Sequence, residues 1–475
     1  MTIQRLKTTF QILRIEIIPF HVKMINERRD FKKKLLCVIL AMAMLTGCGK
    51  GNETPMEEIV EVPTEELLVE EEPQLSIYEE DAMYLVELIE NTHPCFTLDD
   101  IPDDYIVKKE NYLKNSKSVE NIKQFYNESS KYLCTLKDGH TSLYFQEVID
   151  PHVLRISWYS DGKHLYLCDE ENKPSDIKVL QIGGIDVQKI FDVISSYQAL
   201  ENDSAVKRAY RISTKRAHYL QMAGVICDFD GCLLLTLDND KTMEVAWTMD
   251  ESVSVTYEET RYQQNISWEM IGDVFYIDQN LCSIDDPNLE PTCSALKNAL
   301  SNGVTKVVYD VRSNTGGNSA ACYSILESMG MIPPTLGSII RISELAKETY
   351  PSIYGTYRGT PTITGSTGSV ASKKNDKVEL IVLSDETTYS SANKLCALVQ
   401  DGKLGQIIGQ GSSNSPSAYG DILYFKLPYT GLEGQVSHKR FTRADSTADQ
   451  KQLHPDVEVP YGTDALSVAL EMLAE

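Results

Sequence analysis

Apolar residues recur at helical spacing in the first part of the chain with a globular composition. Leu85, Val86 and Ile89 follow this period, and the same pattern continues through residues 77–136. Helices of this kind have one apolar face, which must be covered by a neighbouring element. The pattern therefore predicts a small helical domain over residues 76–150.

A different period follows the helical segment. Residues 154–250 consist of short runs separated by turns, as in residues 179–187, where a strand, a paired-glycine turn and a returning strand precede a helix at 188–198. These runs predict a β-rich middle region over residues 151–265. No group in it stands out as catalytic.

The last part of the chain, residues 266–475, alternates strands with helices. The run at 306–311 is almost entirely apolar, as in a strand covered on both faces. The apolar runs predict strands at 273–277, 306–311, 378–383 and 406–409, and helices at 292–302, at 320–329 and from Ser390 onwards. This alternation predicts βαβ units and a mainly parallel sheet, so the fold class is α/β.

Residues 28–48 have the pattern of an export signal. Basic residues cluster at 28–34, an apolar run too short to span a bilayer follows at 35–44, and Leu45-Thr46-Gly47-Cys48 ends it. This order resembles a bacterial lipoprotein signal peptide, which implies cleavage before Cys48 and a lipid on its sulfur. The alternative is a plain secretory signal with an incidental cysteine. Residues 1–23 fit no region of a signal peptide, so Met24 is an alternative start.

An acidic segment comes next. Residues 48–75 combine many glutamates with prolines and contain no aromatic residue, a composition that predicts a disordered tether. The formal net charge of -24 for the whole chain argues against nucleic acid or anionic lipid as a partner. The resulting prediction is an extracytoplasmic protein held at the bacterial cell membrane by a lipid anchor.

Nine of the 11 cysteines lie beyond Cys48, so at least one has no partner within the chain. They form no C-x-x-C pair, and their spacing predicts neither a zinc site nor a compact disulfide framework. Cys227 and Cys232 could close a hairpin, a pairing that the sequence leaves open. The others are expected to be small buried apolar residues.

The strongest candidate for chemistry is the turn before the last predicted helix. Ser390 follows a buried strand and opens that helix, where backbone amides favour a developing negative charge. A serine in this place suits a nucleophile. Its commoner role is simply to cap the helix.

Two other segments hold groups that such a serine would need. The strand at 306–311 leads into a loop with Gly316 and Gly317, and paired glycines can bring bare amides close to a ligand, as an oxyanion hole requires. The segment Asp-Gly-His-Thr at 138–141 places His140 after a glycine turn, where it could serve as a general base.

In this order the segments resemble the C-terminal-processing peptidase family, which includes tail-specific proteases and tricorn. The family pattern is D-G-H-T, D-x-R-x-N-x-G-G, S-A-x-E, a strand ending in glycine, and P-D-x-x-V. It is matched in order at residues 138–141, 310–317, 390–393, 407–409 and 455–459. The likeness covers residues 76–475. It implies a crotonase-like β/α catalytic core over 266–475, a helical N-terminal cap domain, and a degenerate PDZ-like domain in the β-rich middle region.

The resemblance also implies roles for single residues. Ser390 matches the nucleophile by its spacing, with Ser391 as the rival, and the amides of Gly317 and Ser391 match the oxyanion hole. In the tail-specific branch the general base is a lysine after the glycine-ended strand. Residues 409–415 contain no lysine, so a Ser-Lys dyad is not expected.

The tricorn-like branch instead uses a histidine, oriented by an acidic residue shortly before P-D-x-x-V. His140 matches the histidine and Asp449 the acid, with Asp445 and Glu433 as rivals. A base is required because a serine hydroxyl is a poor nucleophile at neutral pH. Asn393 replaces the glutamate of the family pattern, which affects local geometry and removes no catalytic group.

The function expected from these residues is that of a serine-type endopeptidase. It would hydrolyse extracytoplasmic polypeptides through an acyl-enzyme, with the substrate extended along a strand edge and with no metal or organic cofactor. Two alternatives remain open. One is a non-catalytic binding protein on the same scaffold, and the other is a surface adhesin or sensor that recognises cell-wall material.

Overall fold

The computed structural model describes residues 75–98, 100–144, 150–250 and 263–474, which belong to one compact unit, Pro73–Glu475. The predicted signal peptide, the lipidation site Cys48 and the acidic segment up to residue 74 lie outside the described residues. Within the described part, no helix is long and apolar enough to cross a membrane.

The helical region predicted near the start of the globular chain is confirmed. It contains α3 (Ile77–Thr92), α4 (Tyr105–Asn115) and α5 (Ile122–Cys134), with short 3-10 turns at Pro94–Thr97 and Ser116–Ser118. A capping box between Ser76 and Glu79 starts α3, because each side chain accepts a hydrogen bond from the other residue's backbone amide.

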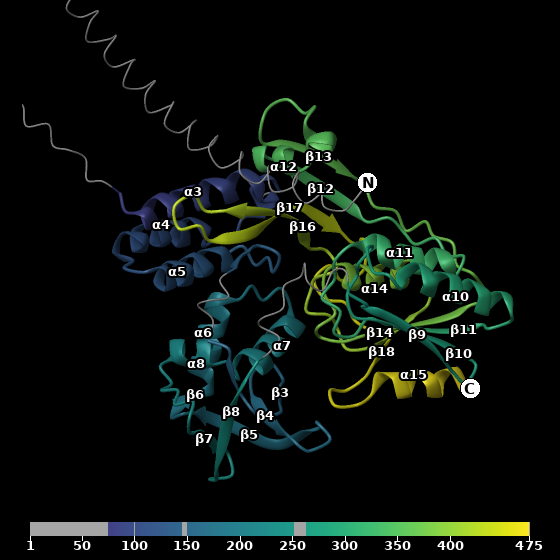
Figure 1. Cartoon of the computed structure of the whole chain (residues 1–475), viewed down its shortest axis with the longest axis horizontal. Helices are drawn as coiled ribbons and strands as arrows, with labels where there is room; N and C mark the ends of the chain where they lie inside the picture. The colour runs from purple at the N-terminus through teal and green to yellow at the C-terminus, as the bar shows by residue number, and fades with distance from the viewer. Residues whose placement is uncertain (1–74, 99, 145–149, 251–262, 475) are drawn as a thin grey trace, which may run out of the picture. The chain divides into compact units, whose positions relative to one another are not determined.

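Strands from the far end of the chain complete the core of this helical region. They form a five-stranded antiparallel sheet with the order β1-β17-β12-β13, in which β16 also pairs with β17 (Figure 1). Leu85 and Phe125 of the helices belong to the same buried cluster as Leu423 and Val436 of the sheet. The strands are β1 (Ser142–Tyr144), β12 (Gly337–Ile342), β13 (Thr362–Ser366), β16 (Tyr419–Lys426) and β17 (Glu433–Thr442), with α12 (Glu344–Thr349) and α13 (Pro351–Tyr354) between β12 and β13.

The middle region is rich in strands, as predicted. Its seven-stranded sheet has the order β2-β8-β7-β5-β4-β3, with β6 beside β5. The predicted strand, glycine turn and helix are present, and Gly183 and Gly184 take positive φ angles of 56° and 77° in that turn. The elements are β2 (His152–Leu154), β3 (Trp158–Ser160), β4 (Leu165–Cys168), β5 (Pro174–Ile182), β6 (Ile185–Asp186), α6 (Val187–Tyr197), α7 (Asp203–Ser213), α8 (Ala217–Ala223), β7 (Cys232–Leu237) and β8 (Thr242–Met249).

The C-terminal region contains the predicted parallel sheet, with the order β18-β15-β14-β11-β10-β9. All neighbouring pairs run parallel except β9 with β10. Its strands are β9 (Ile266–Ile271), β10 (Val274–Gln279), β11 (Lys306–Asp310), β14 (Glu379–Ser384), β15 (Gln406–Gly409) and β18 (Val457–Glu458), and its helices are α10 (Leu289–Ser301), α11 (Ser319–Ser328), α14 (Ser391–Asp401) and α15 (Ala465–Ala474).

Helices cover both faces of this sheet. Val307 and Tyr309 of β11 belong to the buried cluster that includes α10, α11 and α14, whereas Val308 between them belongs to the cluster that includes α15. Figure 1 shows α15 on the opposite face from the other three helices. Alternate residues of one strand point to opposite faces, so the apolar run at 306–311 is explained by burial on both sides.

All nine cysteines of the described region are free thiols, Cys227 and Cys232 included. Five of the nine are buried, at positions 95, 282, 293, 322 and 396. Those five fit the prediction of small buried apolar residues.

Candidate active site

The carboxyl ends of three parallel strands bring the candidate segments together. Asp310 at the end of β11 is in register with Leu383 of β14, and Ser384 of β14 is in register with Gly409 of β15. The loops that follow these strands therefore leave the same edge of the sheet. This edge is the usual place for a site in an open α/β sheet.

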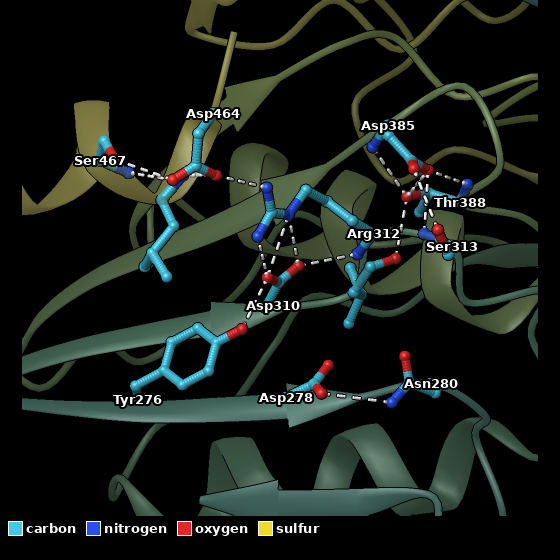
Figure 2. A network of polar contacts seen from close by, with 12 residues as sticks. Tyr276, Asp278, Asn280, Asp310, Arg312, Ser313, Asp385, Thr388, Asp464 and Ser467 are labelled. Atoms are coloured by element: carbon cyan, nitrogen blue, oxygen red, sulfur yellow. Dashed lines mark hydrogen bonds and ion pairs between the residues drawn. The ribbon is translucent and has the colours of Figure 1, made fainter. Parts of the chain in front are cut away.

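A polar network fixes the first two of these loops (Figure 2). The Arg312 guanidinium donates to Asp310 at 2.6 and 3.0 Å and to Asp464, at the start of α15, at 3.0 Å. Asp385 accepts a hydrogen bond of 3.0 Å from the Ser313 amide and thereby joins the loop after β11 to the loop after β14. The position of the glycine pair is thus set by charged hydrogen bonds.

Ser390 has a strained backbone at the start of α14. Its φ of 51° and ψ of -117° lie in a region that L-residues rarely adopt. The Ser390 amide donates to the side-chain oxygen of Asn414 at 3.0 Å, which holds this conformation. Within the described part of the chain, the Ser390 side chain makes no hydrogen bond, and the residue lines a cavity of about 800 Å³. An unbonded hydroxyl that faces a cavity is available for reaction.

The neighbouring Ser391 is placed differently. Its side chain is buried, its hydroxyl donates to the Gly317 carbonyl at 2.7 Å, and it shares a further hydrogen bond with Ser319. This hydroxyl therefore connects α14 to the glycine loop. Of the two rival serines, the geometry leaves Ser390 as the one with a free hydroxyl.

The two amides predicted for the oxyanion hole are both unused. Among the described residues, neither the Gly317 amide nor the Ser391 amide donates a hydrogen bond, and both residues line the cavity with Ser390. Gly317 has a φ of 124°, which only glycine adopts readily. The amides are therefore free to bind an anion that forms beside Ser390.

His140 lines the same cavity from the loop between α5 and β1. It is 8% exposed, and its ring lies 5.0 Å from the Tyr389 ring, centroid to centroid. In the described structure, neither ring nitrogen has a hydrogen-bond partner. The fold therefore brings Ser390, His140, Gly317 and Ser391 to one cavity, with the imidazole free to exchange a proton.

The carboxylate beside His140 is Asp138. Its Oδ1 lies 3.6 Å from the Nδ1 of His140 and accepts the His140 backbone amide at 2.9 Å. The other oxygen accepts from His93, Thr141 and Ser437. Burial opposes the charged form, but the neighbouring His140 and His93 rings keep the pKa of Asp138 well below its usual range. Asp138 is therefore a buried, ionised carboxylate.

The third triad member expected from the sequence is not at this site. The Asp449 carboxylate accepts from the amides of Lys451 and Gln452 and lies 3.1 Å from the His454 ring, and none of these contacts involves His140. Its rivals are also engaged elsewhere, because Asp445 accepts from Thr447 and Glu433 pairs with Lys426. Local turns after Asp445 and Asp449 capture these carboxylates, a competition that residue order does not reveal.

Glu201, which precedes α7 in the middle region, is a residue of this site that the sequence did not predict. Its Oε1 accepts from the Tyr389 hydroxyl at 2.6 Å and the Gly139 amide at 3.2 Å. Its Oε2 accepts from the side chain of Asn414 at 2.8 Å and the amide of Ser415 at 3.0 Å. No motif marks Glu201. The one signal near it is Asn202, whose side chain caps α7.

Asp138, His140 and Glu201 form the one cluster in the described residues with the composition of a metal site. One ligand atom from each lies within 4.8 Å of the others. Protein donors already occupy both oxygens of Asp138 and of Glu201, so among the three only His140 offers a ligand atom without a hydrogen-bond partner in the described structure. The cluster fits a structural and proton-transfer role better than a metal-binding one.

Residues 283–459 match the model of Peptidase family S41. The match lies within the region 266–475 that was predicted to hold the catalytic core, and it supports the family that the ordered motifs resemble. No curated protein sequence matches the chain.

Among solved structures, mature CPAF complexed with lactacystin is similar to this chain, with a TM-score of 0.56 at 13% identity over 84% of this chain and 96% of that one. The photosystem II D1 C-terminal processing protease has a TM-score of 0.43 at 14% identity over 82% and 99%. The tricorn protease has a TM-score of 0.40 at 15% identity over 84% and 37%. At these identities the CPAF likeness shows the fold, and it extends over most of the chain.

Proposed function

We propose that this protein is a serine-type endopeptidase in which Ser390 is the nucleophile and His140 the general base. The observation that carries the proposal is the arrangement around Ser390. Judged by the residues that the structure describes, its free hydroxyl, an imidazole without hydrogen-bond partners and two unused amides line one cavity. Each of these groups has a defined place in acyl transfer.

The reaction follows from these positions. The Ser390 oxygen attacks the carbonyl carbon of the scissile peptide bond while His140 accepts the hydroxyl proton. The amides of Gly317 and Ser391 bind the oxyanion of the tetrahedral intermediate. His140 then returns the proton to the leaving amine, and water hydrolyses the acyl-enzyme by the same proton transfers in reverse.

Asp138 takes the orienting role that the sequence suggested for Asp449. It lies on the Nδ1 side of His140, so Nε2 is the nitrogen left to serve Ser390. An ionised carboxylate there stabilises the imidazolium that forms when His140 takes the proton. The gap of 3.6 Å would close when a substrate is bound, as is common in empty active sites.

A fluorophosphonate probe tests this assignment. Wild-type protein should form one covalent adduct, Ser390→Ala none, and His140→Ala only a slow one, as followed by intact mass. Ser391→Ala removes the neighbouring hydroxyl and leaves Ser390 in place, so the adduct should still form, at a reduced rate because the bond to the Gly317 carbonyl is lost. A folded wild-type protein that neither labels nor cleaves any peptide would contradict the proposal and favour the binding or sensor alternatives.

The proposal includes an extracytoplasmic location with a lipid on Cys48, supported by the basic cluster, the short apolar run and the Leu-Thr-Gly-Cys sequence. Metabolic labelling with radioactive palmitate in a bacterial host tests it. Label should be incorporated by wild type and by Cys37→Ser, and not by Cys48→Ser. Label that persists in Cys48→Ser would refute lipidation at this position.

A further inference from the structure

Lys394 is a cation that lies at the edge of the candidate active site and has no ion pair among the described residues. It lies one turn into α14, and its backbone amide donates to the Ser390 carbonyl at 2.9 Å. Its Nζ lies 3.3 Å from the centroid of the Phe441 ring. Within the described residues, this ammonium makes no hydrogen bond and no ion pair. The aromatic face is therefore its only direct partner there.

The charged groups around Lys394 do not neutralise it. Asp421 of β16 is paired with Lys439 of β17, so its charge is already shared. Glu327 of α11 is exposed to solvent and makes no ion pair with Lys394. Burial lowers the pKa of Lys394 to about 7, with the charge of Asp421 opposing this shift and that of Lys439 adding to it. An anion that reaches an unpaired, partly buried ammonium would stabilise its charged form.

A recess next to the Ser390 cavity gives access to Lys394. We call it the Lys394 recess. Its volume is about 500 Å³, and it shares Ser319, Tyr323, Lys394 and Phe441 with the Ser390 cavity. Its remaining wall has an apolar part, formed by Ile332, Pro333, Pro334 and Leu336, and a polar part, formed by Glu327, Thr335 and Ser338. A side chain that enters from the cavity meets Lys394 and the apolar part of the wall, while the exposed Glu327 also lines the recess.

We infer that the Lys394 recess binds a carboxylate of the polypeptide substrate and that Lys394 is the residue that selects for it. The inference rests on the proposed function, since it assigns a substrate class to the same site. A carboxylate is the anion that every polypeptide carries, at acidic side chains and at its C-terminus. Both sources share the chemistry that pairs with an ammonium, and the apolar walls suit the methylene groups that carry it.

Binding and cleavage of defined peptides test this. Four fluorescent pentapeptides would carry Glu or Gln at the central position, each with a free or an amidated C-terminus. On the Ser390→Ala background, fluorescence anisotropy should show about tenfold to hundredfold tighter binding for the version with the preferred carboxylate. Preference for Glu with either end identifies an acidic side chain as the ligand, and preference for the free end identifies the C-terminus.

Variants of Lys394 assign the preference to this residue. Lys394→Met should abolish it and Lys394→Arg should keep most of it. Lys306→Met, which removes a surface lysine paired with Asp273, should leave it unchanged. If Lys394→Met fails to fold, the inference is tested by the carboxylate preference of Lys394→Arg and by the pH dependence of that preference in wild type. The preference should weaken as the pH rises above about 7, where the free ammonium loses its proton.

Failure of the inference is distinguishable from failure of the proposed function. Equal binding of all four peptides, with cleavage that depends on Ser390, would overturn the carboxylate site and leave the peptidase intact. Selective binding without any cleavage by wild type would leave the site and contradict the peptidase. A preference that survives in Lys394→Met, or loss of cleavage without loss of preference, would assign Lys394 a different role and overturn the inference.

Discussion

The hydroxyl of Tyr389 donates a hydrogen bond of 2.6 Å to Glu201, a residue 188 positions earlier in the chain. The same carboxylate accepts from Gly139, next to the candidate base, and from Asn414, which holds the Ser390 amide. Burial and the neighbouring Glu201 charge raise the pKa of Tyr389 well above its usual range, so the hydroxyl stays a donor. One carboxylate thus connects three segments of the candidate active site.

This connection predicts that Glu201 acts by positioning. Glu201→Gln keeps the shape but loses the charge that four donors share, so we expect kcat/KM to fall by about tenfold to hundredfold, with a stability loss of about 1–3 kcal/mol. Peptide hydrolysis and urea unfolding measure the two effects. Glu171→Gln, at an exposed surface pair with Lys173, is the control and should change neither. If Glu201→Gln and Glu171→Gln had the same kcat/KM and the same stability, Glu201 would have no positioning role in the site.

The contact between Asp138 and His140 predicts which carboxylate supports the base. Asp138→Asn removes a buried charge that accepts from His93, Thr141, Ser437 and the His140 amide, so we expect a loss of about 3–5 kcal/mol in stability and near-complete loss of hydrolysis. Asp449→Asn should lower kcat by less than about twofold, because its contacts are with a surface turn. If Asp449→Asn lowered hydrolysis more than Asp138→Asn did, Asp449 would be the third triad member, as the sequence suggested.

The pH dependence of Asp138 has a definite sign. Its pKa is lowered on folding, so its contribution to stability is fully present above the unfolded value of 3.8 and is lost as the pH falls through the folded value. Wild type should therefore lose stability relative to Asp138→Asn as the pH is lowered below about 4. Urea unfolding at pH 3, 5 and 7 measures the difference, and a constant difference across this range would argue against an ionised Asp138.

Much of the fold could be predicted from local sequence patterns. The strand at 306–311 was predictable because burial on both faces leaves an apolar run, and α14 was predictable because it follows such a strand. The packing of the helical region against β12, β16 and β17 could not be predicted in this way. Phe125 and Val436 share one core, but no period within either segment indicates its partner.

Some residues of the candidate site could likewise be predicted from the sequence, and others could not. Ser390, His140 and Gly317 lie in ordered motifs, so sequence could propose them together. Glu201 could not be found, because its role depends on where the loop before α7 lies in space. Lys394 was also missed, since a lysine within a helix is usually exposed and its burial depends on Phe441 from a distant strand.

Close contact between Gly316 and Ser390 predicts a severe effect from one methyl group. A Cβ at Gly316 would lie 2.6 Å from the Ser390 Cβ and 2.9 Å from the Ser391 amide nitrogen, so Gly316→Ala should displace the nucleophile and abolish probe labelling. Gly303→Ala is the matched control. Gly303 has a similar φ of 97° but nothing within 4 Å of the added methyl, so strain alone should cost about 1–2 kcal/mol with labelling intact. Normal labelling of Gly316→Ala would contradict the described loop geometry.

Burial of Lys394 predicts a stability gain when its charge is removed. Burial lowers the pKa of Lys394 from 10.5 to about 7, so the unfolded chain binds more protons than the native protein between these values, and stability rises with pH across that interval. Lys394→Met should therefore be more stable than wild type, with the full difference below pH 7 and none above about pH 10.5. Thermal unfolding at pH 6, 8 and 10 measures this trend, with Lys306→Met as the variant expected to show none. A difference independent of pH would mean that Lys394 is solvated, and the carboxylate inferred for the recess would then lose its physical basis.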